Sequence, residues 1–135
     1  MANFWYTAAL TALMNGDLDL VNDDIRAVLV KSTHTPQRDA HDNLDDISGG
    51  DRVATSGALQ NKSVSAGSWD ADDYTFSALS GAAFSQVILY KHTGTESDST
   101  LILRIDQGAN LPYTPDGSDF DLVWAAAGIA RLSHT

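Results

Sequence analysis

Short apolar runs between turn residues are the feature that most constrains how this chain folds. The clearest are rich in β-branched and aromatic residues and are bounded by Asp, Asn, Gly, Ser or Thr; they span residues 25–30, 86–90, 101–105 and 120–124. Runs of this length and composition are typical of β-strands. A chain built in this way can form a rigid shell of sheets, so we expect a structural or binding protein and not an enzyme.

Further strands are expected where shorter runs alternate between polar and apolar residues, at 52–55, 62–65, 69–76 and 129–132. The total is about eight strands at a spacing of about ten residues, which is typical of sandwiches, jelly rolls and barrels. The run from Ile25 to Lys31 is too continuous for a half-solvated strand and predicts a central strand. We therefore expect an all-β fold, a jelly-roll-like antiparallel β-sandwich, over residues 1–135 as a single domain.

One helix is expected, at residues 3–15, with Asn3 as its N-cap. Its apolar positions fall near one face at helical spacing. The pair Asn15-Gly16 is a sound stop, because glycine tolerates the left-handed conformation at a helix C-terminus. This helical segment, residues 1–16, is expected to pack on or next to the sandwich.

The charge balance bears on possible partners. The formal net charge of −10 repels phosphate backbones, so we expect no nucleic-acid binding. An acidic surface permits an encounter with a basic protein surface, although simple solvation explains it as well. No signal peptide and no apolar window of about 20 residues is visible, so we expect folding in a cytoplasm and no membrane contact.

The residues that could carry chemistry form no recognisable pattern. The chain has no cysteine, and the spacing of its histidines (His34, His41, His92 and His134) fits no familiar zinc site. An EF-hand that began at Asp17 would need Gly and Glu where Asn22 and Val28 stand. There is no Gly-rich phosphate loop and no nucleophile elbow. We expect no cofactor and no metal; a hydrolase on a jelly-roll scaffold, with buried carboxylates or a histidine-bound metal, stays as an alternative.

Two segments are candidates for a partner interface. The aromatic residues near the N-terminus either cap an open end of the core or face a partner protein. The connection from Ser32 to Gly50 is long for a small sandwich, and such loops are often functional. Within it, residues 39–47 are expected to form one or two helical turns with Leu44 and Ile47 on one side. The predicted contacts are Phe4, Trp5, Tyr6, His34, Pro36, His41, Leu44 and Tyr113.

The order of these patterns resembles that of small proteins encoded among the structural genes of tailed bacteriophages. In that family a short amphipathic helix and an N-G-D-[IL]-D turn precede a strand of the type I-[KR]-[VA]-[VA]-L-V, as at residues 13–20 and 24–30 here. Residues 45–47, 52–57, 87–94 and 111–117 also match, so the likeness covers nearly the whole chain. These are patterns of strands and turns, not of catalytic residues.

The resemblance implies a virion component, a capsid decoration or cement protein with a jelly-roll-like fold. Such a protein lies on the outer capsid surface, is assembled in the host bacterial cytoplasm, and bridges subunits of the major capsid protein. It would also associate with itself, as a dimer or trimer. The alternative is a tail or neck protein, including a module that binds a receptor or a glycan.

Overall fold

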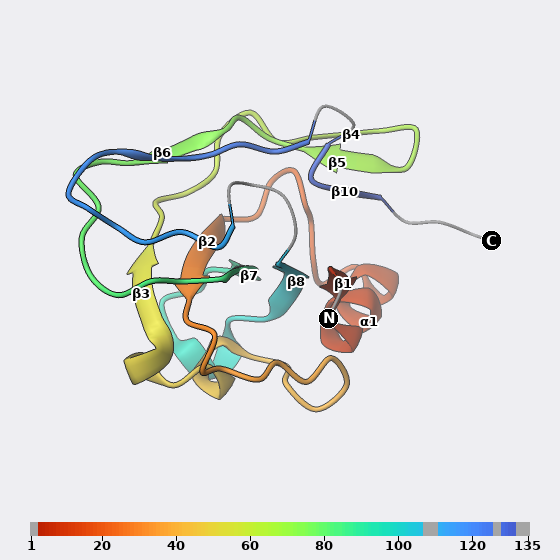
Figure 1. Ribbon diagram of the computed structural model, residues 1–135. Coiled ribbons are helices and arrows are strands. Elements are labelled where there is room, and N and C mark those ends of the chain that lie inside the picture. The colour runs from red at the N-terminus through yellow and green to blue at the C-terminus, as the bar shows by residue number, and fades with distance from the viewer. Residues whose placement is uncertain (1–2, 107–110, 126–127, 132–135) are drawn as a thin grey trace.

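Antiparallel sheets and one short helix make up the computed structural model (Figure 1), so the protein is mostly β. It describes residues 3–106, 111–125 and 128–131. Leu132, the last residue of the strand predicted at 129–132, and His134 lie outside the described residues.

The larger sheet has the order β1-β8-β7-β2-β3. Its strands are β1 (Phe4–Trp5), β8 (Leu101–Ile105), β7 (Gln86–Lys91), β2 (Ile25–Val30) and β3 (Arg52–Thr55). Strand β2 pairs with β7 on one side and with β3 on the other, which confirms the central position predicted from its continuous apolar run. Both faces of this sheet are covered, and this is why β2, β7 and β8 are buried almost throughout.

Two smaller sheets form a second layer. One has the order β10-β5-β4, from β4 (Ser63–Ser65), β5 (Ser68–Asp70) and β10 (Ala130–Arg131). The other pairs β6 (Tyr74–Phe76) with β9 (Phe120–Leu122). Because β5 leads into β6, and their partners are β10 and β9, the two pairs continue one another as a ribbon that lies across the larger sheet (Figure 1). The two layers are consistent with an all-β sandwich.

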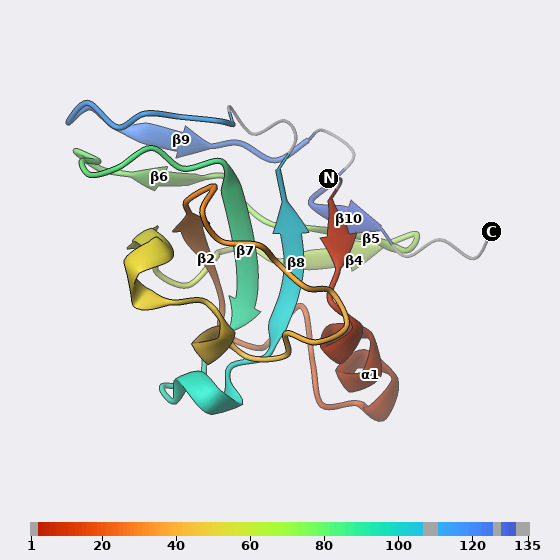
Figure 2. The ribbon, with the colours of Figure 1, turned by 60° about the horizontal axis from the view of Figure 1, so that its bottom comes forward.

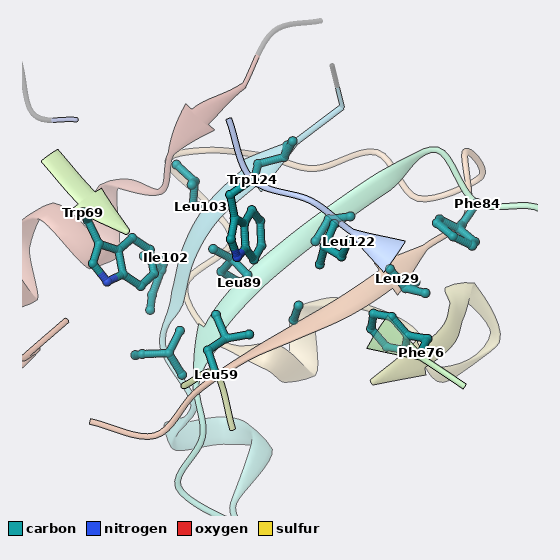
Figure 3. Close-up of a cluster of buried hydrophobic side chains, with 14 of the residues drawn as sticks. Leu29, Leu59, Trp69, Phe76, Phe84, Leu89, Ile102, Leu103, Leu122 and Trp124 are labelled. Carbon is teal, nitrogen blue, oxygen red and sulfur yellow. The ribbon is translucent and has the colours of Figure 1, made fainter. Parts of the chain in front are cut away.

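The main core lies between these layers (Figure 3). Trp69, Trp124 and Leu122 come from the second layer and pack with Leu89 and Ile102 of the larger sheet. Both buried indoles keep a hydrogen-bond partner, since Trp69 Nε1 donates to the Leu20 carbonyl and Trp124 Nε1 to the Asp72 carbonyl, each at 3.0 Å. This satisfies the polar end of each ring while its apolar body is buried.

The N-terminal helix is shorter than predicted. It is α1 (Thr7–Asn15), its N-cap residue is Tyr6, and the expectation that Asn3 caps it is wrong. The preceding residues pair instead with β8, Phe4 opposite Arg104 and Trp5 opposite Leu103, because the edge of β8 offers backbone partners. The C-terminal stop is confirmed, since Gly16 has a φ of 79° and its N–H bonds to the last carbonyls of the helix.

The connections contain three turns of 3₁₀ helix, η1 (Leu44–Asp46), η2 (Gly49–Asp51) and η3 (Glu96–Asp98). The described residues form ten strands, where the sequence predicts about eight. Two differences account for this: β1 replaces the start of the predicted helix, and the single strand expected at 69–76 is divided into β5 and β6. No helix among the described residues is both long enough and apolar enough to cross a membrane.

Candidate functional site

The long connection of residues 32–47 lies over the face of the larger sheet that is turned away from the second layer; we call this side the loop face. Figure 2 shows the segment crossing β7 and β8. Leu44 and Ile47 are buried in one cluster, as predicted, and η1 is the helical turn that places them there. The sheet and its N-terminal edge contribute the rest of that cluster: Tyr6, Val28, Val30, Ile88, Tyr90 and Leu101.

Backbone hydrogen bonds hold this segment to the neighbouring elements. The Thr7 N–H, at the start of α1, donates to the Arg38 carbonyl at 3.1 Å. Farther along, the Leu44 N–H donates to the Ser99 carbonyl at 2.9 Å, and the Leu101 N–H donates to the Asp42 carbonyl at 3.0 Å. The loop is therefore tied both to the helix and to the chain that enters β8.

A buried polar network joins the sheet to the start of the loop. Gln86 and Arg104, on adjacent strands, are both buried, and Arg104 Nε donates to Gln86 Oε1 at 2.9 Å. The amide nitrogen of Gln86 donates to the carbonyls of Lys31 and His34, each at 2.9 Å. Arg104 Nη1 also donates to Asp106 Oδ2 at 2.8 Å. The side chains of β7 and β8 thus set where the loop leaves the sheet.

Arg52, on the edge strand β3, holds the other end of the loop. Its Nη2 donates to the Leu44 carbonyl at 2.8 Å and to the Ile47 carbonyl at 2.7 Å, and its Nε donates to Ile47 at 3.0 Å. The same guanidinium makes two bonds of 2.9 Å to the Glu96 carboxylate of η3. A planar fork of donors suits these acceptors in a way that a lysine ammonium does not.

Two histidines of the loop stack on each other, with ring centroids 5.5 Å apart and an interplanar angle of 28°. Burial, assisted by the neighbouring His41, lowers the pKa of His34. The nearby carboxylates of Asp51 and Asp46 act in the opposite direction, and the Arg104 guanidinium adds to the lowering. His34 is therefore neutral at pH 7. His41 Nδ1 accepts a hydrogen bond from the Gln37 N–H at 3.2 Å, which closes the turn between them.

Three buried polar atoms lack a hydrogen-bond partner among the described residues: Tyr6 Oη, His34 Nε2 and Asp106 Oδ1. Burial raises the pKa of the Tyr6 phenol well above its ordinary value, so the phenol is neutral. A buried polar atom without a partner costs about 1–3 kcal/mol. The loop face therefore carries an energetic cost that the indoles of the main core avoid.

The structure brings most of the predicted contact residues to the loop face but turns several of them inward. Tyr6 has no exposed surface, and His34, Pro36 and Leu44 are buried too, so these four offer no surface to a partner. The reason is that the loop covers an apolar sheet face and must bury side chains to do so. Tyr6 packs within the apolar cluster beneath the loop. Phe4 and His41 are half-buried on this face.

Two predicted contact residues lie elsewhere. Trp5 packs toward the main core, with its ring 6.5 Å from that of Trp69. Tyr113 is half-buried, with its ring 4.6 Å from that of Phe120.

The exposed residues of the loop belong to the segment that the sequence analysis put forward, but none of them is among the contacts that it named individually. The side chains of Arg38 and Asp39 are 59% and 74% exposed. Thr33, Thr35, Gln37 and Ala40 are exposed as well. Their polarity could have identified most of them, because polar side chains that alternate with buried apolar or aromatic residues usually face solvent.

The acidic residues and histidines were also compared with the requirements of a metal site. Within the described ranges, no group of three or more His, Asp or Glu side chains is placed to hold a metal ion. In the acidic turn that follows α1, the Asp19 carboxylate accepts bonds from the N–H groups of Val21 at 3.0 Å and Asn22 at 3.1 Å. Asn22 Nδ2 also donates to the Asp19 carboxylate, at 2.7 Å. This side-chain bond is the main cause of a lowered pKa at Asp19, and the two backbone bonds add to it. The turn is thereby capped by its own side chain.

Comparison with known proteins adds no relative. No protein-family model matches the chain, and no curated protein matches it.

Proposed function

We propose that this protein is a non-enzymatic structural protein of a tailed-phage virion, a decoration or cement protein that binds the outside of the head. In this role it bridges subunits of the major capsid protein through its loop face and associates with further copies of itself. The finer description of the sandwich as a jelly roll belongs to the same proposal. The pairing of β6 with β9, distant in sequence, supports a sandwich of that kind.

The observation that carries the proposal is the way the exposed loop is held. Residues 32–47 present polar side chains outward, while Gln86 and Arg52 bind the loop backbone from beneath and Arg104 holds the Gln86 side chain. A loop fixed in this way loses little conformational entropy when it binds, which favours affinity from a small contact area. On a repetitive shell, many such contacts add through effective concentration.

The test is binding to shells assembled from the major capsid protein of the same genome. Arg38→Glu changes the charge of the most exposed basic residue on the loop, and Arg131→Glu makes the same change on β10 in the second layer. We expect wild type and Arg131→Glu to co-sediment with shells, and Arg38→Glu to lose most of its occupancy. Equal occupancy for both variants would remove the loop face from the interface.

The alternative placement in a tail or neck has its own outcome in this experiment. If the wild-type protein does not bind shells at any concentration, the decoration role is wrong. Binding to purified tails, or to host cells or glycans, would then identify the alternative.

A further inference from the structure

The second layer ends in an edge strand without charge. In the order β10-β5-β4, strand β4 has a partner on one side alone within the described part of the chain, and all three of its residues are exposed. Residues 63–69 include no charged side chain, in a chain of net charge −10. Lys62, which precedes β4, donates through Nζ to the Leu59 carbonyl at 3.2 Å. Edge strands are usually protected by shortness, charge, proline or a bulge; β4 has three residues and carries none of the other three devices.

The register shows which backbone groups face the open edge. Val64 lies opposite Trp69, between the pairs Ser63–Asp70 and Ser65–Ser68. The Trp69 carbonyl accepts a bond from the Ile129 N–H at 2.7 Å, on the side of β10. In an antiparallel pair, opposed residues either both bond to each other or both point outward. The N–H and C=O of Val64 therefore point away from β5, toward the free edge.

A second copy of this strand fits that edge. In an antiparallel register centred on Val64, the two Val64 residues exchange both backbone bonds, and each Ser63 faces Ser65 of the other copy. No charged residue of β4 meets a like charge. The Val64 side chain is 53% exposed, and it would lie beside its counterpart on one face of the joined sheet. The contact is self-complementary, as a twofold dimer requires.

We propose that two copies of the protein pair through β4 in this register and join their second layers into one continuous sheet. A basic extended peptide would be a poorer partner, because β4 itself offers it no carboxylate and the one on the hairpin, Asp70, lies on the neighbouring strand β5. The β4–β5 turn lies at the outer end of the second layer in both views (Figures 1 and 2). This inference names a surface for self-association and does not depend on what the loop face binds.

The dimer is expected to be weak. Stable protein interfaces bury about 1,200–2,000 Å² in total. A three-residue edge provides less than that, so the dimer should form as concentration rises and should gain strength where many copies are held on a lattice.

Sedimentation velocity of the full chain, from micromolar to millimolar concentration, tests the pairing. We expect a concentration-dependent dimer in the wild type and its loss in Val64→Lys, which places two like charges directly opposite each other. Met14→Lys is the matched control, because Met14 is 82% exposed near the end of α1 and the variant should dimerise like wild type. A wild type that stays monomeric at millimolar concentration overturns the proposal, and so does a dimer that Val64→Lys leaves intact.

Oxidative cross-linking tests the register. The chain has no cysteine, so Val64→Cys and Ser63→Cys each introduce a single thiol. Directly opposed residues of a hydrogen-bonded pair have Cα atoms about 5.5 Å apart, which suits a disulfide. Val64→Cys should therefore cross-link rapidly, and Ser63→Cys, which faces Ser65, should not. Equal rates would exclude the register. Neither assay uses capsid shells, so their failure is separable from failure of the capsid-binding proposal.

Discussion

The two faces of the larger sheet are stabilised by different kinds of contact. On the inner face, rings such as Phe84 and Phe120 meet edge to face with centroids 5.1 Å apart, within the larger of the two apolar clusters. On the loop face a smaller apolar cluster shares the surface with Gln86, Arg104 and three polar atoms without partners. Apolar burial is non-directional, so it stabilises a layer without specifying one loop conformation. Directional hydrogen bonds can specify one, and the loop face uses them for that purpose.

The largest expected effect comes from the inner face. Phe120→Ala should lower the free energy of unfolding by about 4 kcal/mol, because the cavity removes contacts with the rings of Phe76, Phe84 and Tyr113. Phe120→Leu should cost less than about 1.5 kcal/mol, since apolar volume is largely kept. Urea unfolding followed by tryptophan fluorescence measures both. If the two substitutions cost the same, the inner face is not governed by packed volume.

The second-largest loss of stability is expected when the ion pair between Arg104 and Asp106 is broken. Arg104→Leu should cost about 3 kcal/mol, because it leaves the Asp106 carboxylate buried without its cation and removes the donor to Gln86. Replacing both Arg104 and Asp106 by leucine should recover a large part of that loss. The same unfolding experiment measures the coupling. A loss in the double variant equal to the sum of the losses in Arg104→Leu and Asp106→Leu would mean that the pair does not act as a unit.

Trypsin cleavage after Arg38 distinguishes the two faces in these variants. Its side chain is exposed while the loop backbone is hydrogen-bonded, so cleavage reports local opening of the loop. Arg104→Leu should accelerate cleavage more than its global destabilisation requires, and Phe120→Ala should not. The same acceleration in both variants would show that the loop opens only when the whole protein unfolds.

The smallest effect should be a pH dependence that arises from the loop face. The pKa of His34 is lowered in the folded protein, so the unfolded chain binds the proton more readily. Stability is then complete above about pH 6.5 and is lost as pH falls from that value toward the lowered pKa. His34→Asn should reduce this slope in urea unfolding, whereas His92→Asn, outside the loop, should keep it. An unchanged slope in His34→Asn would assign the pH dependence to other groups.

Parts of this fold could be predicted because their signal is local. The continuous apolar runs of β2, β7 and β8 predict buried strands wherever they are placed, and Gly16 ends a helix through its own backbone freedom. Strand β1 could not be found in this way. Two residues carry too little pattern, and Phe4 and Trp5 are extended because β8 supplies their backbone partners.

By itself, the sequence determined that this is a mostly β protein, that residues 25–30 form an interior strand of the larger sheet, and where the N-terminal helix ends. Only the tertiary structure decided which side chains of the loop turn inward. His34 and Leu44 are buried, and Arg38 is exposed, because the loop must cover the apolar side of the sheet while Gln86 and Arg52 bind its carbonyls. Burial and long-range hydrogen bonds depend on segments far apart in the chain, and no local pattern encodes their meeting.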